Sequence, residues 1–253
     1  MSWDPKVYMA FASERTRPAA ELLARIPNDA PGRVADLGCG PGNSTALLAA
    51  RWPHADIEGV ESSPDMITEA KASGVKARFT LADVASWSPD TPCDVIFSNA
   101  TLQWLPHHKT LLPRLMTHAA KGGTFAFQIP RNFDAPSHAL MRAVAAEGSW
   151  AARLSNVRNI NAHTPEYYYD ILAPLSSSLD IWESEYQHVL EGDDPVLRWV
   201  SGTGLRPFVQ ALHGAEREGF IARYAARLRE AYPKRADGRT LFPFKRLFLV
   251  ARP

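Results

Sequence analysis

The chain has 253 residues, a formal net charge of +1 and an apolar share of 45%, which is ordinary for a protein with a sizeable core. Because the net charge is close to zero, a large phosphate-binding surface is disfavoured, and we expect no nucleic-acid partner. No apolar run approaches the ~20 residues of a membrane span, and the start of the chain lacks a signal-peptide pattern. We therefore expect a cytoplasmic protein with no membrane association.

The two cysteines, Cys39 and Cys93, form neither a ligand cluster nor a disulfide framework. Both lie in hydrophobic or glycine-rich sequence at strand ends, so we expect them to be reduced and structural. His138 and His163 have no carboxylate or cysteine at a spacing that suggests a metal ligand set. The sequence therefore predicts no metal site.

Strand and helix patterns alternate along the first half of the chain. One predicted helix spans residues 44–50 with Asn43 or Ser44 as its cap, and Ser63-Pro64-Asp65 opens the next helix. Strands separated by helices imply right-handed crossovers and a parallel sheet. The predicted strands span residues 33–37, 56–61, 76–81, 93–98 and 123–128.

The second half loses this alternation. Residues 130–174 and 194–232 have mostly helical patterns, and strands are predicted at 179–186 and 244–250. No internal repeat divides the chain, so we expect one domain over residues 1–253. Its predicted parts are an N-terminal helical segment at 1–30, a ligand-binding core at 31–130, and a helical substrate cover at 131–175 and 193–240.

A glycine-rich turn, Asp36-Leu37-Gly38-Cys39-Gly40-Pro41-Gly42, lies between the first strand and its helix. Glycines there allow a tight turn and a close approach of backbone to ligand, and the helix N-terminus offers unpaired N–H groups. Glu61 ends the second strand, 19 residues beyond Gly42, where a carboxylate can accept both hydroxyls of a ribose. This combination predicts a nucleoside-containing ligand.

The spacing of the turn is D-x-G-x-G-x-G, whereas the dinucleotide-binding fingerprint is G-x-G-x-x-G. Residues 34–42 instead resemble the first motif of class I S-adenosylmethionine-dependent methyltransferases. The resemblance implies the Rossmann-like α/β fold of that family, with a mostly parallel seven-stranded sheet and helices on both faces. It also implies a helical cover formed by insertions after strands five and six. The implied cofactor is S-adenosylmethionine, and the implied product is S-adenosylhomocysteine.

Three further segments match the family at the carboxyl ends of strands. Glu61 matches its ribose-binding acid, Asp83 its adenine-binding position, and residues 98–105 its segment beneath the transferring methyl group. The cofactor-binding residues that the resemblance implies are Asp36, Gly38, Gly40, Gly42, Asn43, Glu61, Ser62, Asp83, Val84, Ser98, Asn99 and Leu102.

A narrower resemblance is carried by residues 3–8, 98–105 and 199–205. Together these segments are similar to the family of trans-aconitate methyltransferases. That resemblance implies formation of a monomethyl ester on a small polycarboxylic acid, and therefore a small anionic partner.

Such an acceptor carboxylate is ionised at neutral pH, so no catalytic base is required and the protein must supply alignment and positive charge. His107 and His108 are candidate bases, although adjacent histidines at a helix start more often face solvent or cap the helix. Tyr167, Tyr168 and Tyr169 lie in a predicted helix and cannot all point to one site. The predicted substrate-binding residues are Gln103, Trp104, Arg131, Trp199, Arg206, Arg15 and Arg17.

Three alternatives stay open at this point. The first is a methyltransferase that acts on nitrogen, oxygen or carbon of another small metabolite. The second is a binding module that retains the cofactor pocket without catalysis. The third is a nicotinamide-dependent oxidoreductase, which the glycine spacing disfavours.

Overall fold

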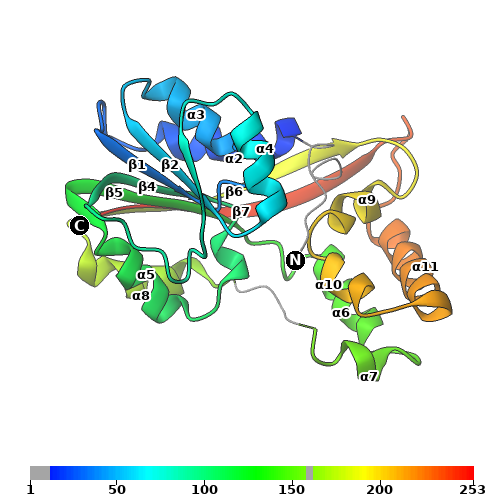
Figure 1. The fold of residues 1–253 in the computed structure, drawn as a ribbon. Helices are drawn as coiled ribbons and strands as arrows, with labels where there is room; N and C mark the ends of the chain where they lie inside the picture. The colour runs from blue at the N-terminus through cyan, green and yellow to red at the C-terminus, as the bar shows by residue number, and fades with distance from the viewer. Residues whose placement is uncertain (1–11, 158–161) are drawn as a thin grey trace. The chain divides into compact units, whose positions relative to one another are not determined.

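The computed structural model describes residues 12–157 and 162–253, and of residues 12–15 it describes the backbone alone. The chain forms two compact units (Figure 1). The first unit comprises the described residues of Met1–Pro130, Asn161–Ser184 and Arg246–Pro253. The second unit comprises those of Arg131–Ile160 and Glu185–Lys245.

The strands form a seven-stranded sheet in the order β3-β2-β1-β4-β5-β7-β6. The pairs from β3 across to β5 are parallel, and β7 runs antiparallel to β5. This mixed, mostly parallel sheet confirms the predicted fold class. The strands are β1 (Arg33–Leu37), β2 (Asp56–Glu61), β3 (Arg78–Leu81), β4 (Cys93–Asn99), β5 (Ala119–Pro130), β6 (Ser178–Leu190) and β7 (Thr240–Arg252).

Strands β1 and β2 begin and end at the predicted residues, because each apolar run is bounded by turn residues. Strand β3 begins at Arg78 rather than Lys76, and β5, β6 and β7 extend beyond the predicted ranges. In β7 the residues added before Phe244 alternate between buried Thr240 and Phe242 and the less buried Leu241 and Pro243. A proline on the less buried side interrupts the hydrophobic pattern without ending the strand.

Helices cover both faces of the sheet in the first unit. The crossovers through α3 (Asn43–Arg51) and α4 (Pro64–Ala72) step away from β1 in one direction, and the crossover through α5 (His108–Met116) steps in the other. Right-handed connections therefore place α5 on the opposite face from α3 and α4, as Figure 1 shows. The N-terminal helix α2 (Ala12–Ala24) contacts α3 and β5.

The caps of these helices follow from local sequence. Ser63 accepts a hydrogen bond from the Met66 N–H and precedes Pro64 at the first position of α4, as the sequence predicted. The predicted cap of α3 is wrong, because Gly42 is the N-cap and Asn43 is the first helical residue. Gly42 has φ 95°, a left-handed conformation that glycine adopts without strain, and it ends the glycine turn. The helix therefore begins at Asn43, one residue earlier than predicted.

Helix α8 (Pro165–Leu172), continued by a short helix η2 (Ala173–Leu175), belongs to the first unit, although its residues were predicted to form part of the substrate cover. Its Tyr168 and Leu172 are fully buried in the same hydrophobic cluster as Phe127 of β5 and Leu112 of α5. Tyr169 is 57% exposed, so the three tyrosines face different surroundings, as helical periodicity predicted.

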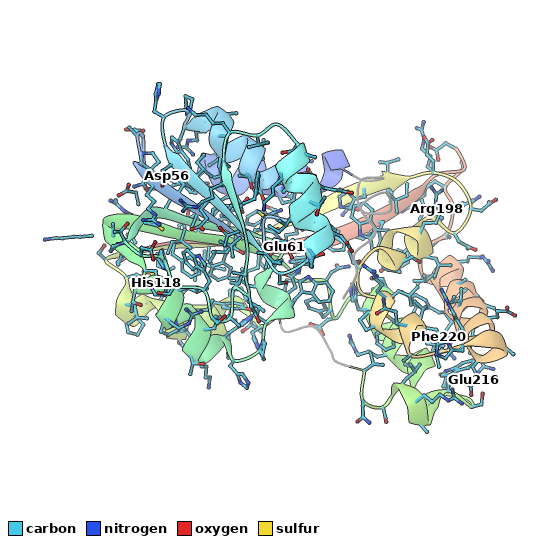
Figure 2. The ribbon with its side chains drawn as sticks, viewed as in Figure 1. Asp56, Glu61, His118, Arg198, Glu216 and Phe220 are labelled. Atoms are coloured by element: carbon cyan, nitrogen blue, oxygen red, sulfur yellow. The ribbon has the colours of Figure 1, made fainter. Side chains whose placement is uncertain are left out.

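The described part of the second unit contains α6, α7, α9, α10 and α11 together with the adjoining ends of β6 and β7. Phe220 of α11, labelled in Figure 2, is fully buried and stacks on Phe208. Helices α6 and α11 are joined by the Tyr224 hydroxyl, which donates to the Ser137 carbonyl at 2.6 Å. These helices are α6 (Pro136–Ala145), α7 (Ala151–Leu154), α9 (Pro195–Ser201), α10 (Arg206–Gln210) and α11 (Gly214–Ala231). No described helix is both long enough and apolar enough to cross a membrane.

Candidate functional site

The glycine turn follows β1 in a conformation that requires glycine. Gly38, Gly40 and Gly42 all have positive φ, between 54° and 95°. The Gly38 N–H donates to the Val60 carbonyl at 2.7 Å, and a side chain at Gly38 would overlap Thr101. A Cβ at Gly40, in contrast, would meet no heavy atom within 4 Å. The turn is therefore packed on its Gly38 side and open at Gly40, as close approach of a ligand requires.

Asp36 lies behind this turn and is completely buried. The hydroxyls of Ser44 and Thr45 each donate to its Oδ2 at 2.7 Å, whereas its buried Oδ1 has no hydrogen-bond partner. Burial raises the pKa of Asp36 to about 6, so the carboxylate is ionised at neutral pH. A buried carboxylate with a remaining acceptor atom suits a cationic ligand group, and the implied cofactor carries both an ammonium and a sulfonium.

Glu61 lies where β2 ends and the chain turns toward α4 (Figure 2). Its Oε1 accepts from the N–H groups of Ser62 and Ser63 at 2.8 and 2.9 Å, and its Oε2 accepts from the Gly40 N–H at 3.2 Å. These bonds hold the carboxylate against the turn while the side chain stays partly exposed. An acid fixed at a parallel strand end beside a glycine turn fits the ribose of a nucleoside ligand.

The segment after β3 is exposed at Asp83, whose Oδ1 accepts from the Ala85 N–H at 2.8 Å. Val84 is buried, so its side chain faces the core rather than solvent. Arg114 of α5 fastens this segment, because its guanidinium donates to the carbonyls of Val84, Ala85 and Trp87 at 2.5–2.9 Å. Arg114 was not predicted from the sequence, since these partners lie about 30 residues away along the chain.

At the end of β4 the predicted residues divide into two groups. Ser98 and Leu102 are fully buried, and the Ser98 hydroxyl donates to the Leu37 carbonyl at 2.8 Å, which joins β4 to β1. Asn99 and Gln103 instead have buried side-chain oxygens with no hydrogen-bond partner. The Gln103 Nε2 donates to the carbonyl of Ala100, a residue with φ 55°. A non-glycine residue in this conformation is strained, and such strain is characteristic of functional segments.

A small cavity of about 20 Å³ lies at this edge of the first unit. It contains room for little more than a water-sized group. It is bounded by α2, the glycine turn and β4, which shows that these elements converge at the predicted edge. The lining residues are Thr16, Ala19, Gly38, Cys39, Pro41, Asn43, Ser44 and Asn99.

The predicted substrate-binding cations are distributed over both units. Arg17 of α2 is exposed and forms an ion pair with Glu21 at 2.9 Å. The side chain of Arg15 and the predicted segment 3–8 lie outside the described residues. Arg131 and Arg206 are half-buried and belong to the second unit.

The two predicted tryptophans have different surroundings. Trp104 lies in a short helix η1 (Leu102–Trp104) of the first unit and is half-buried. Trp199 is 2% exposed in the aromatic core of the second unit, with its ring 4.3 Å from that of His188. Packing with aromatic neighbours accounts for the burial of Trp199.

A cavity of about 610 Å³ lies within the second unit, a size that suits a small metabolite. Arg131, Arg235 and Lys245 line it together with two acids, Asp134 and Glu185. Another cavity in this unit, of about 310 Å³, is lined by Arg229 and Lys234, which pair with its own aspartates. The larger cavity is therefore the better site for an anionic ligand.

A buried polar pair in the first unit was also not predicted from the sequence. Arg246 of β7 is 4% exposed, and its Nη1 donates to the Gln128 Oε1 at 3.3 Å. Gln128 is aligned with Asn99 across β4 and β5, and its buried Nε2 has no hydrogen-bond partner. The hydrophobic strand patterns around both residues gave no reason to single them out.

Both cysteines are buried and free, and burial raises the pKa of the Cys93 thiol to about 11. The described residues contain no group of three or more His, Cys, Asp or Glu side chains placed to hold a metal ion. His138 is half-buried, and its desolvation lowers its pKa to about 4, so the ring is neutral near pH 7.

Comparisons with known proteins agree with this geometry. A model of the methyltransferase domain family matches residues 11–173. The chain is 50% identical over 252 residues to the trans-aconitate 2-methyltransferase of Azoarcus sp. strain BH72, which covers 99% of this chain and 98% of that protein. It is 52% identical to the protein of the same name from Methylobacterium nodulans, over the same shares of the two chains.

Solved structures share the fold at low sequence identity. The YcgJ protein from Bacillus subtilis aligns with a TM-score of 0.62 at 14% identity, covering 94% of this chain and 99% of that one. The [4+2]-cyclase SpnF aligns with a TM-score of 0.53 at 16% identity, covering 94% and 81%. Since a cyclase has this fold, the fold alone does not determine the reaction.

Proposed function

The chain belongs to the methyltransferase family, and we propose that it transfers the methyl group of S-adenosylmethionine to one carboxylate of trans-aconitate. One observation carries the proposal. The 50% identity with trans-aconitate 2-methyltransferases extends over 99% of the chain, so it includes the second unit as well as the glycine turn. A relative that shared only the cofactor edge would support the cofactor and say nothing of the acceptor.

The residues of the first unit suit this cofactor. S-adenosylmethionine, when bound, supplies an electrophilic methyl group on a cationic sulfonium. Glu61 would accept the ribose hydroxyls, and Asp83 would accept from the adenine amino group. The buried charge of Asp36 favours a cation near the turn. The open side of Gly40 leaves room for the ligand to lie against the backbone.

The acceptor requires positive charge rather than a base. A carboxylate is already nucleophilic and ionised at neutral pH, so alignment of the two reactants supplies most of the catalysis, on the order of 7–11 kcal/mol. We assign the carboxylates of the acceptor to Arg131 and Lys245 in the cavity of about 610 Å³. For the first unit, taken by itself, Gln103 and Trp104 of η1 are proposed as residues that contact the acceptor.

Incubation of the protein with S-adenosylmethionine and trans-aconitate is expected to yield a monomethyl ester and S-adenosylhomocysteine, detected by mass spectrometry. Because no base acts, kcat is expected to be constant from about pH 7 to about pH 9. A change of kcat with pH in this range, as a titrating base would cause, would indicate a nitrogen, hydroxyl or carbon acceptor instead. An absence of ester with trans-aconitate and related polycarboxylates would contradict the proposed acceptor.

Arg131→Ala is expected to raise the KM for trans-aconitate about ten- to a hundredfold, since a charge-assisted hydrogen bond contributes about 1.5–3 kcal/mol. Arg131→Lys keeps the charge but loses the planar fork, so its KM should lie between the two. Arg198→Ala is the control, because Arg198 is exposed in the same unit and does not line this cavity. Equal KM values for Arg131→Ala and the wild type would remove Arg131 from the acceptor site.

A further inference from the structure

His108 is a buried histidine that methyl transfer to a carboxylate does not use. It is the first residue of α5 and is 2% exposed, contrary to the expectation that it faces solvent or caps the helix. The exposed residue and N-cap is its neighbour, His107. The Nδ1 of His108 lies 3.0 Å from the Tyr168 hydroxyl, and its Nε2 lies 2.8 Å from the Leu102 carbonyl oxygen. Tyr168 is fully buried in α8 of the same unit.

The partners of His108 determine where its proton lies. A carbonyl oxygen can only accept, so Nε2 carries the hydrogen and donates to Leu102. Burial lowers the pKa of His108, and the ring is therefore neutral near pH 7. The Nδ1 atom then accepts from the Tyr168 hydroxyl, whose oxygen accepts in turn from the His163 N–H at 3.3 Å. Every donor in this series of hydrogen bonds therefore has a matching acceptor.

This arrangement excludes His108 as the base of the reaction. Both ring nitrogens are engaged by protein atoms, and the ring is buried, so neither nitrogen can reach an acceptor molecule. The hydrogen-bonded chain ends instead at the backbone of η1. Leu102 opens η1, and its carbonyl also accepts from the Leu105 N–H at 3.0 Å. The two residues that complete η1 are Gln103 and Trp104.

We propose that His108 and Tyr168 are positioning residues that hold η1 in the conformation needed to bind the acceptor. Tyr168 fixes the ring of His108, and His108 fixes the Leu102 carbonyl. The Gln103 Nε2 donates to the carbonyl of the strained Ala100. This bond fixes the orientation of the Gln103 side chain, and with it the direction of its unpartnered Oε1 and the position of the neighbouring Trp104. This inference rests on the proposed function, because it takes η1 to be part of the acceptor site. The hydrogen bonds of Glu61 do not involve this network, whereas Thr101, the N-cap of η1, donates through its hydroxyl to the Gly38 carbonyl at 3.1 Å.

The first test compares Tyr168→Phe with Tyr169→Phe. Each variant loses one hydroxyl from α8, but Tyr169 is exposed and outside the network. Tyr168→Phe is expected to raise the KM for trans-aconitate about tenfold, a change that corresponds to 1.4 kcal/mol. The calorimetric Kd for S-adenosylhomocysteine should change by less than about twofold. Equal KM values for the two variants, or a parallel loss of cofactor affinity in Tyr168→Phe, would overturn the proposal.

Two conservative substitutions of His108 separate positioning from simple packing. His108→Gln can place an amide N–H near the former Nε2 and restore the bond to Leu102, whereas His108→Asn reaches only the Nδ1 position. Positioning predicts a lower KM for His108→Gln than for His108→Asn. It also predicts that Tyr168→Phe has little further effect in the His108→Gln background, because the two residues act in series. Additive effects of the two substitutions on KM would contradict the proposal that Tyr168 acts through His108.

A spectroscopic measurement makes the test independent of the acceptor. The indole N–H resonance of Trp104, assigned with Trp104→Phe, is expected to shift in Tyr168→Phe and to stay in place in Tyr169→Phe. If trans-aconitate is not turned over but the Trp104 resonance shifts, the proposed acceptor fails while the positioning network stands. If the ester forms normally and the resonance is unchanged, the network fails while the proposed function stands.

Discussion

Glu61→Ala is expected to weaken the binding of S-adenosylmethionine by about 1–3 kcal/mol, or roughly 5- to 150-fold, because a charged acceptor for the ribose hydroxyls is lost. The same change removes the acceptor of the Ser62, Ser63 and Gly40 N–H groups, so the free energy of unfolding should also fall. Calorimetric titration measures the first effect, and urea unfolding measures the second.

Glu61→Gln separates these two roles. The amide oxygen can still accept from the Ser62 and Ser63 N–H groups, but the amide nitrogen can accept a hydrogen bond neither from the Gly40 N–H nor from a ribose hydroxyl. We therefore expect a substantial loss of cofactor affinity with a smaller loss of stability than in Glu61→Ala. Glu58→Gln is the matched control, since Glu58 lies on the same strand and bonds to Thr80 and Arg78. Cofactor affinity of Glu61→Gln equal to that of Glu58→Gln would contradict the ribose assignment.

The part of the fold that could be predicted from sequence is the part encoded locally. The glycine turn, the bounds of β1 and β2 and the start of α4 depend on residues within a few positions of each other. The position of α8 does not, because a helical pattern is the same whether the helix packs on the sheet or covers a substrate. Its placement depends on contacts such as that of Tyr168 with Phe127, which are about 40 residues apart in the chain.

The candidate site divides in the same way. Asp36 and Glu61 are recognisable because each lies at a fixed spacing from the glycines. His108, Arg114 and the Gln128–Arg246 pair are not, since each of them depends on a partner between 27 and 118 residues away. Sequence position also cannot distinguish Trp199, buried in an aromatic core, from half-buried Trp104. Local sequence patterns therefore identify the residues of the glycine turn and of the end of β2, whereas side chains held by distant partners become visible only in the structure.

Gly38→Ala is expected mainly to lower stability and Gly40→Ala mainly to lower cofactor affinity, although both replace a glycine of positive φ in the same turn. An alanine in this conformation costs about 1–2 kcal/mol at either position. At Gly38 the new methyl group would also overlap Thr101, which adds about 1–3 kcal/mol of overpacking. We therefore expect Gly38→Ala to lower the free energy of unfolding by about 2–5 kcal/mol.

Gly40→Ala should lower stability by the backbone cost alone, because its Cβ meets no protein atom within 4 Å. That open space is where the proposed cofactor would approach the backbone, so the methyl group should reduce affinity for S-adenosylhomocysteine about tenfold or more. Urea unfolding and calorimetric titration of both variants give the comparison. Wild-type affinity in folded Gly40→Ala would mean that the ligand does not lie on this side of the turn. The expected pattern, in which Gly38 is required for folding and Gly40 for binding, would assign separate roles to two glycines that the sequence motif treats alike.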